Sequence, residues 1–546
     1  MTFVLARRLF FSCAAACVLA AACGKSGASL DITLYTPVRE EQLPFDNVRL
    51  LRVNVTAPGL TRPPQIFDVA AGIGRITDLP LSRFVSVTVD GLAGADAAPI
   101  SRGYAPPVDL LGGVAVTLPV LFAQVDRFAT NVSIADGVRA DLVDQRVGQS
   151  VTLLKDGRVL IAGGAIISAQ GGVQSPLVAA ELYDPATGLS ASVPPMGFAR
   201  AFHSATLLKD GRVLVSGGIS LISGALSAVA TAEVFDPATK AFRNTGGFTE
   251  SRGRVSHTAS LLPDGRVMLA GGWGEGGNGQ RTILDSAELF DPASGRYSAA
   301  GNLRIARSSH TATLLFDGRV LLAGGRSPTG ALASTELFNA AATPMFSDGP
   351  ALPGEPRAGH AAVRLGSGFV LVVGGCRAPE PINARASAGT GSGCHAVDGA
   401  TPPATTALSR VDLYDPGSGA VGQFVEGIVP PLQESRTDAT LTLLPGDARV
   451  LVAGGLGQDG SSKALAELIE ESPGPIYARR PVVGRMRVGR TFHGATRLAS
   501  GVVLLCGGSA RSGPLFNFSV LNAIELYVPE PGPAVQQWAR RVRGFI

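Results

Sequence analysis

The chain has 546 residues, enough for more than one domain, and its 69 glycines suit a fold with many tight turns. Lys and Arg total 47 while Asp and Glu total 43, which gives a net charge of +4 at pH 7 with neutral histidines. This near balance argues against the strongly basic surface of nucleic-acid-binding proteins, so we expect no nucleic-acid partner.

The N-terminus has the pattern of a secretory signal. Arg7 and Arg8 precede an apolar stretch at 9–22 that is too short to span a membrane, and Cys23 follows it. A basic start, a short apolar core and small residues before a cut are typical of a signal peptide, which we place at residues 1–22.

The end of that segment, Leu-Ala-Ala-Ala-Cys at 19–23, resembles the bacterial lipobox, although the lipobox prefers a branched residue where Ala20 stands. The resemblance implies that Cys23 is lipidated and binds the membrane, with residues 23–29 as a flexible tether. Because Gly24 rather than Asp follows the cysteine, it also implies an outer-membrane lipoprotein of the cell envelope, facing either side. Ordinary secretion with cleavage nearby is the alternative.

Residues 30–125 predict a small β-domain. Pro and Gly turns separate the expected strands, which are 30–35, 48–56, 65–70, 84–89 and 114–121. The pattern favours a β-sandwich, similar in outline to the immunoglobulin-like or transthyretin-like modules found beside propellers. We expect this domain to act as a spacer.

The rest of the chain is dominated by a Gly-Gly doublet that closes an apolar run. The doublets recur at a nearly constant interval, except for one longer step that contains an insert at 376–409. A period of about 50 residues predicts a repeat architecture. The seven doublets begin at Gly163, Gly217, Gly271, Gly324, Gly374, Gly454 and Gly507.

Each copy predicts four short strands and no helix. In the second copy, two apolar runs flank Asp210-Gly211, a pair that favours a tight hairpin turn. Runs such as Val267–Ala270 are apolar at every position, as in strands that are covered on both faces. Four strands per copy predict a β-propeller.

An apolar run, Gly-Gly, a carboxylate–aromatic pair and a later aromatic resemble the kelch repeat, which also builds the propeller of galactose oxidase. The resemblance covers residues 127–546, although the family's late Trp is mostly Phe or Tyr here, as at Phe242 and Tyr297. It implies an all-β protein in which a seven-bladed kelch-like propeller follows the sandwich. Six blades plus a degenerate copy is the alternative, and the closing strand is either 128–134 or 535–539.

Three cysteines remain after the signal peptide and Cys23. Cys376 and Cys394 bracket the insert and predict a disulfide in an oxidising compartment, with two free thiols as the alternative. Cys506 directly precedes a Gly-Gly doublet, where other copies have Ala or Ser, and is expected to be a small buried hydrophobe.

Three polar positions recur around the propeller, and we expect them to be structural because every blade brings the same set. Gln149 and Ala439 replace the histidine in two copies. The repeated set predicts buried ion pairs, with no metal site and no cofactor. Its members are Arg146, Arg200, Arg254, Arg307, Arg357, Arg436 and Arg490; His203, His257, His310, His360 and His493; and Glu181, Glu233, Glu288, Glu336, Asp412, Glu467 and Glu525.

The loops after the doublets vary most in length, and variable loops on a rigid scaffold usually carry binding. Trp273 lies in one of them, where it either stacks on a sugar or partner or is capped by its own loop, and His395 lies in the insert. We find no tyrosine, histidine and cysteine set like the copper site of galactose oxidase, and no catalytic residues are assigned.

These features predict non-catalytic recognition of a protein or glycan through the variable loop face. The alternatives are a carbohydrate-active enzyme, related to the oxidases or sugar mutarotases with kelch-like propellers, and a structural spacer on the cell surface.

Overall fold

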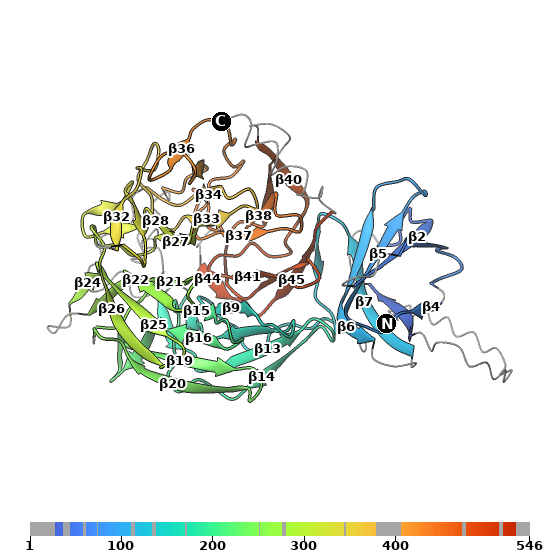
Figure 1. The fold of residues 1–546 in the computed structure, drawn as a ribbon, viewed down its shortest axis with the longest axis horizontal. Coiled ribbons are helices and arrows are strands. Elements are labelled where there is room, and N and C mark those ends of the chain that lie inside the picture. Colours follow the sequence, from blue (N-terminus) through green and yellow to red (C-terminus); the bar gives the residue numbers. More distant parts are fainter. Residues whose placement is uncertain are drawn as a thin grey trace.

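The computed structural model describes residues 28–36, 44–57, 62–73, 75–110, 115–133, 138–169, 172–250, 252–275, 280–342, 345–377, 406–471, 477–512 and 517–530. Every regular element in these segments is a β-strand. In the same segments, no helix is long and apolar enough to cross a membrane. A curled N-terminal sheet lies at the rim of a seven-bladed propeller (Figure 1).

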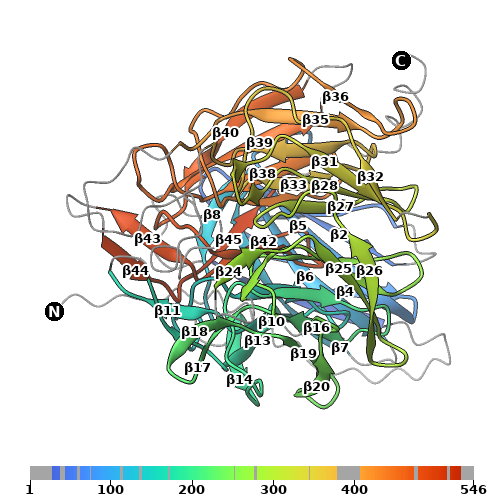
Figure 2. The same ribbon diagram turned by 90° about the vertical axis from the view of Figure 1, so that its left-hand side faces the viewer.

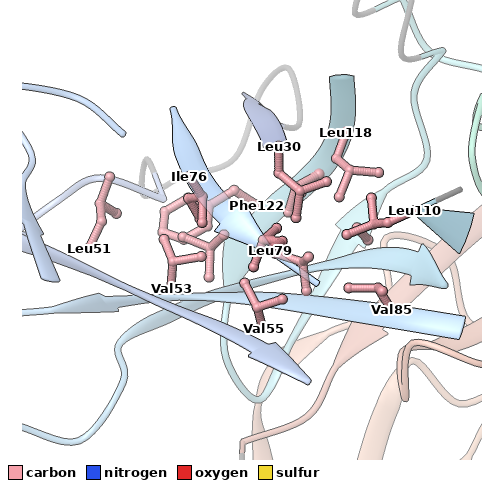
Figure 3. Packing of buried hydrophobic residues seen from close by; sticks show 14 of the residues in the cluster. Leu30, Leu51, Val53, Val55, Ile76, Leu79, Val85, Leu110, Leu118 and Phe122 are labelled. Atoms are coloured by element: carbon pink, nitrogen blue, oxygen red, sulfur yellow. The ribbon is translucent and has the colours of Figure 1, made fainter. Parts of the chain in front are cut away.

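The N-terminal sheet has seven strands in the order β3-β2-β5-β6-β7-β1-β4. Its curl places buried residues such as Leu30, Val53, Leu79, Val85 and Phe122 in one core (Figure 3). The strands are β1 (Ala28–Tyr35), β2 (Leu50–Thr56), β3 (Gln65–Asp68), β4 (Ile76–Leu79), β5 (Ser82–Leu92), β6 (Ser101–Leu110) and β7 (Ala115–Gln124).

The five strands expected in this domain are present, and two more, β4 and β6, join them. All seven belong to one hydrogen-bonded sheet, because β1 pairs in parallel with β7 and antiparallel with β4. The β6 sequence contains Pro106-Pro107, and its pairing with β5 shifts register twice. This irregularity explains why the alternation typical of a strand is missing there.

Each blade is a four-stranded antiparallel sheet. The first strands surround the centre of the disc and the fourth strands lie at its edge (Figure 1). The blades are, in order, β9 (Ser150–Leu153), β10 (Val159–Ala162), β13 (Ala180–Asp184), β14 (Leu189–Val193); β15 (Ser204–Leu207), β16 (Val213–Ser216), β19 (Thr231–Asp236), β20 (Ala241–Gly247); β21 (Thr258–Leu261), β22 (Val267–Ala270), β25 (Ser286–Asp291), β26 (Arg296–Asn302); β27 (Thr311–Leu314), β28 (Val320–Ala323), β31 (Thr335–Phe338), β32 (Phe346–Asp348); β33 (Ala361–Arg364), β34 (Val370–Val373), β35 (Val411–Asp415), β36 (Gln423–Val425); β37 (Thr440–Leu443), β38 (Arg449–Ala453), β39 (Leu465–Glu471), β40 (Tyr477–Arg485); and β41 (Gly494–Arg497), β42 (Val503–Cys506), β45 (Ile524–Val528), β8 (Arg127–Thr130).

The ring is closed by β8, which comes from the N-terminal side of the repeats. It pairs antiparallel with β45, with Thr130 opposite Glu525 and Arg127 opposite Val528. The first strands contact one another in a complete circle, from β9 through β15, β21, β27, β33, β37 and β41 back to β9. The N-terminal candidate therefore closes blade 7, and the rival segment at 535–539 lies outside the described residues.

Five two-stranded hairpins follow Gly-Gly doublets. Strands β11, β17, β18, β43 and β44, from three of these hairpins, lie together on one side of the disc (Figure 2). Contacts join β44 to β11, β12 to β17 and β18 to β23. We call this side the loop end. The hairpin strands are β11 (Ala165–Ile167) with β12 (Val173–Pro176), β17 (Ile219–Ile222) with β18 (Ala225–Ala228), β23 (Trp273–Glu275) with β24 (Arg281–Ile283), β29 (Arg326–Ser327) with β30 (Gly330–Ala331), and β43 (Ser509–Ser512) with β44 (Asn517–Val520).

The doublets join neighbouring blades. Gly217 and Gly218 have φ angles of 63° and 96°, which disfavour a side chain. The Gly218 amide donates a 2.8 Å hydrogen bond to the carbonyl oxygen of Arg254 in the next blade, and a Cβ on Gly217 would overlap that oxygen. All seven doublets donate this bond, including Gly508 to Arg146 between the last blade and the first.

Candidate functional site

The repeated arginines and carboxylates form seven buried ion pairs. In blade 3, Arg254 Nη2 lies 2.9 Å from Glu288 Oε1, while Nη1 donates to the carbonyl oxygens of Gly271 and Ser286. Glu288 also accepts the amide of Thr249 in the linker that enters the blade. The same pairing recurs as Arg146–Glu181, Arg200–Glu233, Arg307–Glu336, Arg357–Asp412, Arg436–Glu467 and Arg490–Glu525.

The five repeated histidines bridge neighbouring blades. Each Nε2 lies 2.9–3.0 Å from a hydroxyl on the first strand of the preceding blade. Burial and a nearby arginine lower the pKa of four of them to about 3, and lower the pKa of His310 well below its usual value. The rings are therefore neutral near pH 7. The pairs are His203–Ser150, His257–Ser204, His310–Thr258, His360–Thr311 and His493–Thr440.

The residues predicted for the binding loops, the disulfide and the lipid anchor lie apart from these repeated positions in the sequence. Trp273 is 7% exposed within the hairpin core, and the Arg281 guanidinium lies over its ring at 4.7 Å, so its own loop caps it. Cys376 is disulfide-bonded. Cys23, Cys394 and His395 lie outside the described residues.

A ring of backbone hydrogen bonds encircles the propeller axis at the loop end. Each member directly precedes the repeated histidine position, and in six of the seven the amide donates to the carbonyl of the counterpart in the preceding blade. Six links of 2.8–3.3 Å join seven residues, all with positive φ. We call this set the axial ring: Gly148, Phe202, Ser256, Ser309, Gly359, Asp438 and Phe492.

In each blade, the axial-ring residue is the exposed residue of its segment. All seven members are partly exposed, whereas the residue before each one is buried in every blade. That preceding residue pairs across a short β-bridge with the first residue after the doublet, as Val255 does with Trp273. The axial ring therefore lies at the end of the disc from which the variable loops leave.

One side of the axial ring is apolar. Phe202 and Phe492 meet edge to face, with ring centroids 5.8 Å apart. Gly148 stands between them in the ring, and a Cβ there would overlap the Phe202 ring. Both phenylalanines pack against the hairpin core that contains Trp273. Phe492, Gly148 and Phe202 form the apolar arc.

The opposite side is polar, with Ser256, Ser309, Gly359 and Asp438 from blades 3 to 6. Asp438 is the only charged member of the axial ring. Thr437, directly before it, places Oγ1 3.1 Å from Asp438 Oδ2. The residues around the axis thus supply a carboxylate, hydroxyl groups and an aromatic pair, the kinds of group that contact a molecule with one apolar face and several hydroxyl groups.

Comparisons with known proteins show the fold. No family model and no curated protein matches the chain. A solved fungal alcohol oxidase of the AA5 family, in complex with copper, is similar at a TM-score of 0.52 and 16% identity, over 71% of this chain and 75% of that one. YjhT is similar at a TM-score of 0.45 and 13% identity, over 62% of this chain and 99% of that one.

The described residues do not fit a copper centre. They contain no group of three or more His, Cys, Asp or Glu side chains that could hold a metal ion. Five of the six histidines are committed to bonds between blades. The seven tyrosines lie in β1, β6, β13, β26, β35, β40 and β45, away from the axial ring.

The prediction of non-catalytic recognition through the loop face is wrong. The finding against it is the likeness in fold to a copper alcohol oxidase. The sequence pattern favoured the variable loops for binding and assigned the repeated Arg and His positions to structure. The position directly before the histidine is where the copies differ, as Gly, Phe, Ser, Ser, Gly, Asp and Phe.

Proposed function

We propose that this protein is a carbohydrate-active enzyme whose substrate binds at the axial ring. One observation carries the proposal: every blade repeats its Arg, carboxylate and Gly-Gly positions, yet the seven members of the axial ring differ in chemistry. A catalytic site on a propeller needs unlike residues converging from different blades. The fold likeness to an alcohol oxidase supports an enzyme that acts on hydroxyl-bearing compounds.

The two arcs suit a sugar ring. The apolar C–H face of a pyranose packs on aromatic rings, here Phe202 and Phe492. Its hydroxyl edge reaches the polar arc, where Ser256 and Ser309 supply hydroxyl groups and Asp438 supplies a carboxylate. A sugar in this orientation places one hydroxyl at the only charged group of the axial ring.

The chemistry that these residues favour is anomer interconversion by proton transfer. Asp438 takes the proton of the anomeric hydroxyl, the C1–O5 bond breaks to give the open aldehyde, and water protonates O5. Ring closure on the other face of the aldehyde reverses these steps and gives the other anomer. No electrons leave the sugar, so no oxidant is needed.

Exchange spectroscopy by NMR tests this proposal, because it measures α–β interconversion of a reducing sugar directly. Neutral, amino and acidic sugars are compared with and without the protein. We expect faster exchange for at least one sugar, and a loss of at least tenfold in Asp438→Asn. Asn tolerates the 54° φ of this position, so this variant keeps the backbone geometry. No acceleration for any sugar would overturn the proposal.

The fold likeness also favours a second candidate, an alcohol oxidase. Its copper ligands would have to come from outside the described residues, since those within do not fit. Hydrogen peroxide formed from O₂ and a primary alcohol or sugar, proportional to bound copper, would establish this candidate in place of anomer interconversion.

We further propose that the repeats are of the kelch type and that the mature protein is an envelope lipoprotein anchored through Cys23. The doublet pattern and the lipobox-like run at 19–23 support these two assignments. Mass spectrometry of the membrane fraction tests the anchor: we expect an acylated N-terminal Cys23, and its loss from the membrane in Cys23→Ala.

A further inference from the structure

We propose that Thr437 is a positioning residue that orients the Asp438 carboxylate toward a sugar at the axial ring; this inference rests on the function proposed above. Thr437 is fully buried. Its Oγ1 lies 3.1 Å from Asp438 Oδ2 and 3.2 Å from the carbonyl oxygen of Gly359, the neighbouring member of the axial ring. One hydroxyl thus links the carboxylate to the backbone of the ring.

The bond restrains the orientation of the Asp438 carboxylate. A charged acceptor makes the stronger hydrogen bond, so the hydroxyl proton favours Oδ2 over the carbonyl of Gly359. With Oδ2 held, the plane of the carboxylate is set relative to the axial ring. Small errors in the placement of a reacting group cost large factors in rate, so this restraint acts on turnover.

A second threonine at the same register provides an internal control. Thr491 directly precedes Phe492 and is also fully buried. Its hydroxyl has no hydrogen-bond partner among the described residues. The five other blades have Val147, Ala201, Val255, Ser308 and Ala358 at this register.

Three variants separate positioning from packing. Thr437→Val keeps the shape and removes the hydroxyl; we expect kcat for anomer interconversion to fall at least tenfold while KM stays within twofold. Thr437→Ser restores the hydroxyl, and we expect kcat within about threefold of the native value. Thr491→Val makes the same chemical change away from a carboxylate and leaves both constants within twofold. Equal losses in Thr437→Val and Thr491→Val would overturn the inference.

A structural measurement keeps the test independent of activity. We expect one χ1 rotamer for Asp438 in the native protein and in Thr437→Ser, and averaged three-bond couplings in Thr437→Val. An unchanged single rotamer in Thr437→Val would overturn the positioning role. If the native protein accelerates no sugar but the couplings change as expected, the proposed function fails while the link between Thr437 and Asp438 stands.

Discussion

Arg254 and Glu288 are 2.9 Å apart with only 1% of either side chain exposed, and the Arg254 backbone carbonyl accepts the Gly218 amide of the preceding blade. One residue therefore ties strands within its blade and also binds the neighbouring blade. The same double role recurs in all seven blades. Such pairs specify geometry, but removing one partner leaves a buried charge.

Arg254→Met should lower the free energy of unfolding by about 3–5 kcal/mol, because Glu288 keeps an unpaired charge. In Arg254→Met with Glu288→Gln the loss should be smaller, since the amide is neutral and its oxygen still accepts backbone amides. Urea denaturation measures both. Arg158→Met is the control: its pair with Asp156 is partly exposed, so about 0–1 kcal/mol is expected. Native-like stability in Arg254→Met would contradict this account.

The buried histidines should make the fold sensitive to mild acid. Burial lowers the pKa of His257 from 6.5 to about 3. In the unfolded chain His257 binds a proton as the pH falls through about 6.5. In the folded protein it binds that proton only near pH 3. Stability is therefore complete above pH 6.5 and falls as the pH drops toward 3, by up to about 1.4 kcal/mol per pH unit for each histidine.

Variants at the repeated histidine position should change the pH dependence of the unfolding free energy in opposite directions. His257→Gln should reduce the dependence of the unfolding free energy on pH between 6.5 and 4.5, and Gln149→His should increase it. Gln149 already occupies the register in blade 1, where its amide donates to the Cys506 carbonyl, so the exchange suits the site. Equal slopes in the native protein and both variants would show that these side chains do not control the acid response.

The doublets should tolerate no side chain. Gly217→Ala places a Cβ against the Arg254 carbonyl oxygen at a φ of 63°. Gly224→Ala has a similar φ of 80° but nothing within 4 Å, so it shows the conformational cost alone, about 1 kcal/mol. We expect Gly217→Ala to be clearly more destabilising in thermal unfolding. Equal melting temperatures for the two variants would contradict the contact between blades.

Ring closure by β8 predicts how the chain can be shortened. A protein that begins at residue 124 keeps β8 and also Asp126, which accepts a 2.8 Å hydrogen bond from Tyr527. One that begins at residue 131 loses the outer strand of blade 7. Calorimetry should show a cooperative transition for the longer form and a much lower melting temperature for the shorter one. Matching transitions would mean that another segment closes the ring.

The sequence was most informative where structure is local. Asp210-Gly211 and the apolar run Val267–Ala270 predicted hairpins and buried strands, because turn geometry and burial act within a few residues. β6 was missed because Pro106-Pro107 and the register shifts interrupt the usual alternation. β8 could not be chosen over its rival, since its partner β45 belongs to the last copy of the repeat and local pattern does not encode pairing between distant segments.

The axial ring could not be foreseen from the sequence. Its members come from seven separate copies of the repeat, and only the backbone bonds around the axis bring Phe202, Phe492 and Asp438 into one set. The informative signal was variation at a fixed register, whereas repetition attracted attention to the Arg and His positions. Those repeated residues hold the blades together.

The axial ring is joined through backbone amides and carbonyls, so these bonds do not depend on the side chains of its members, except at Gly148, where a Cβ would overlap the Phe202 ring. Every position has a positive φ, which Gly, Phe, Ser and Asp all adopt here. A scaffold of this kind separates architecture from chemistry. A single substitution in the axial ring can therefore change which substrate binds, while the rest of the propeller stays the same.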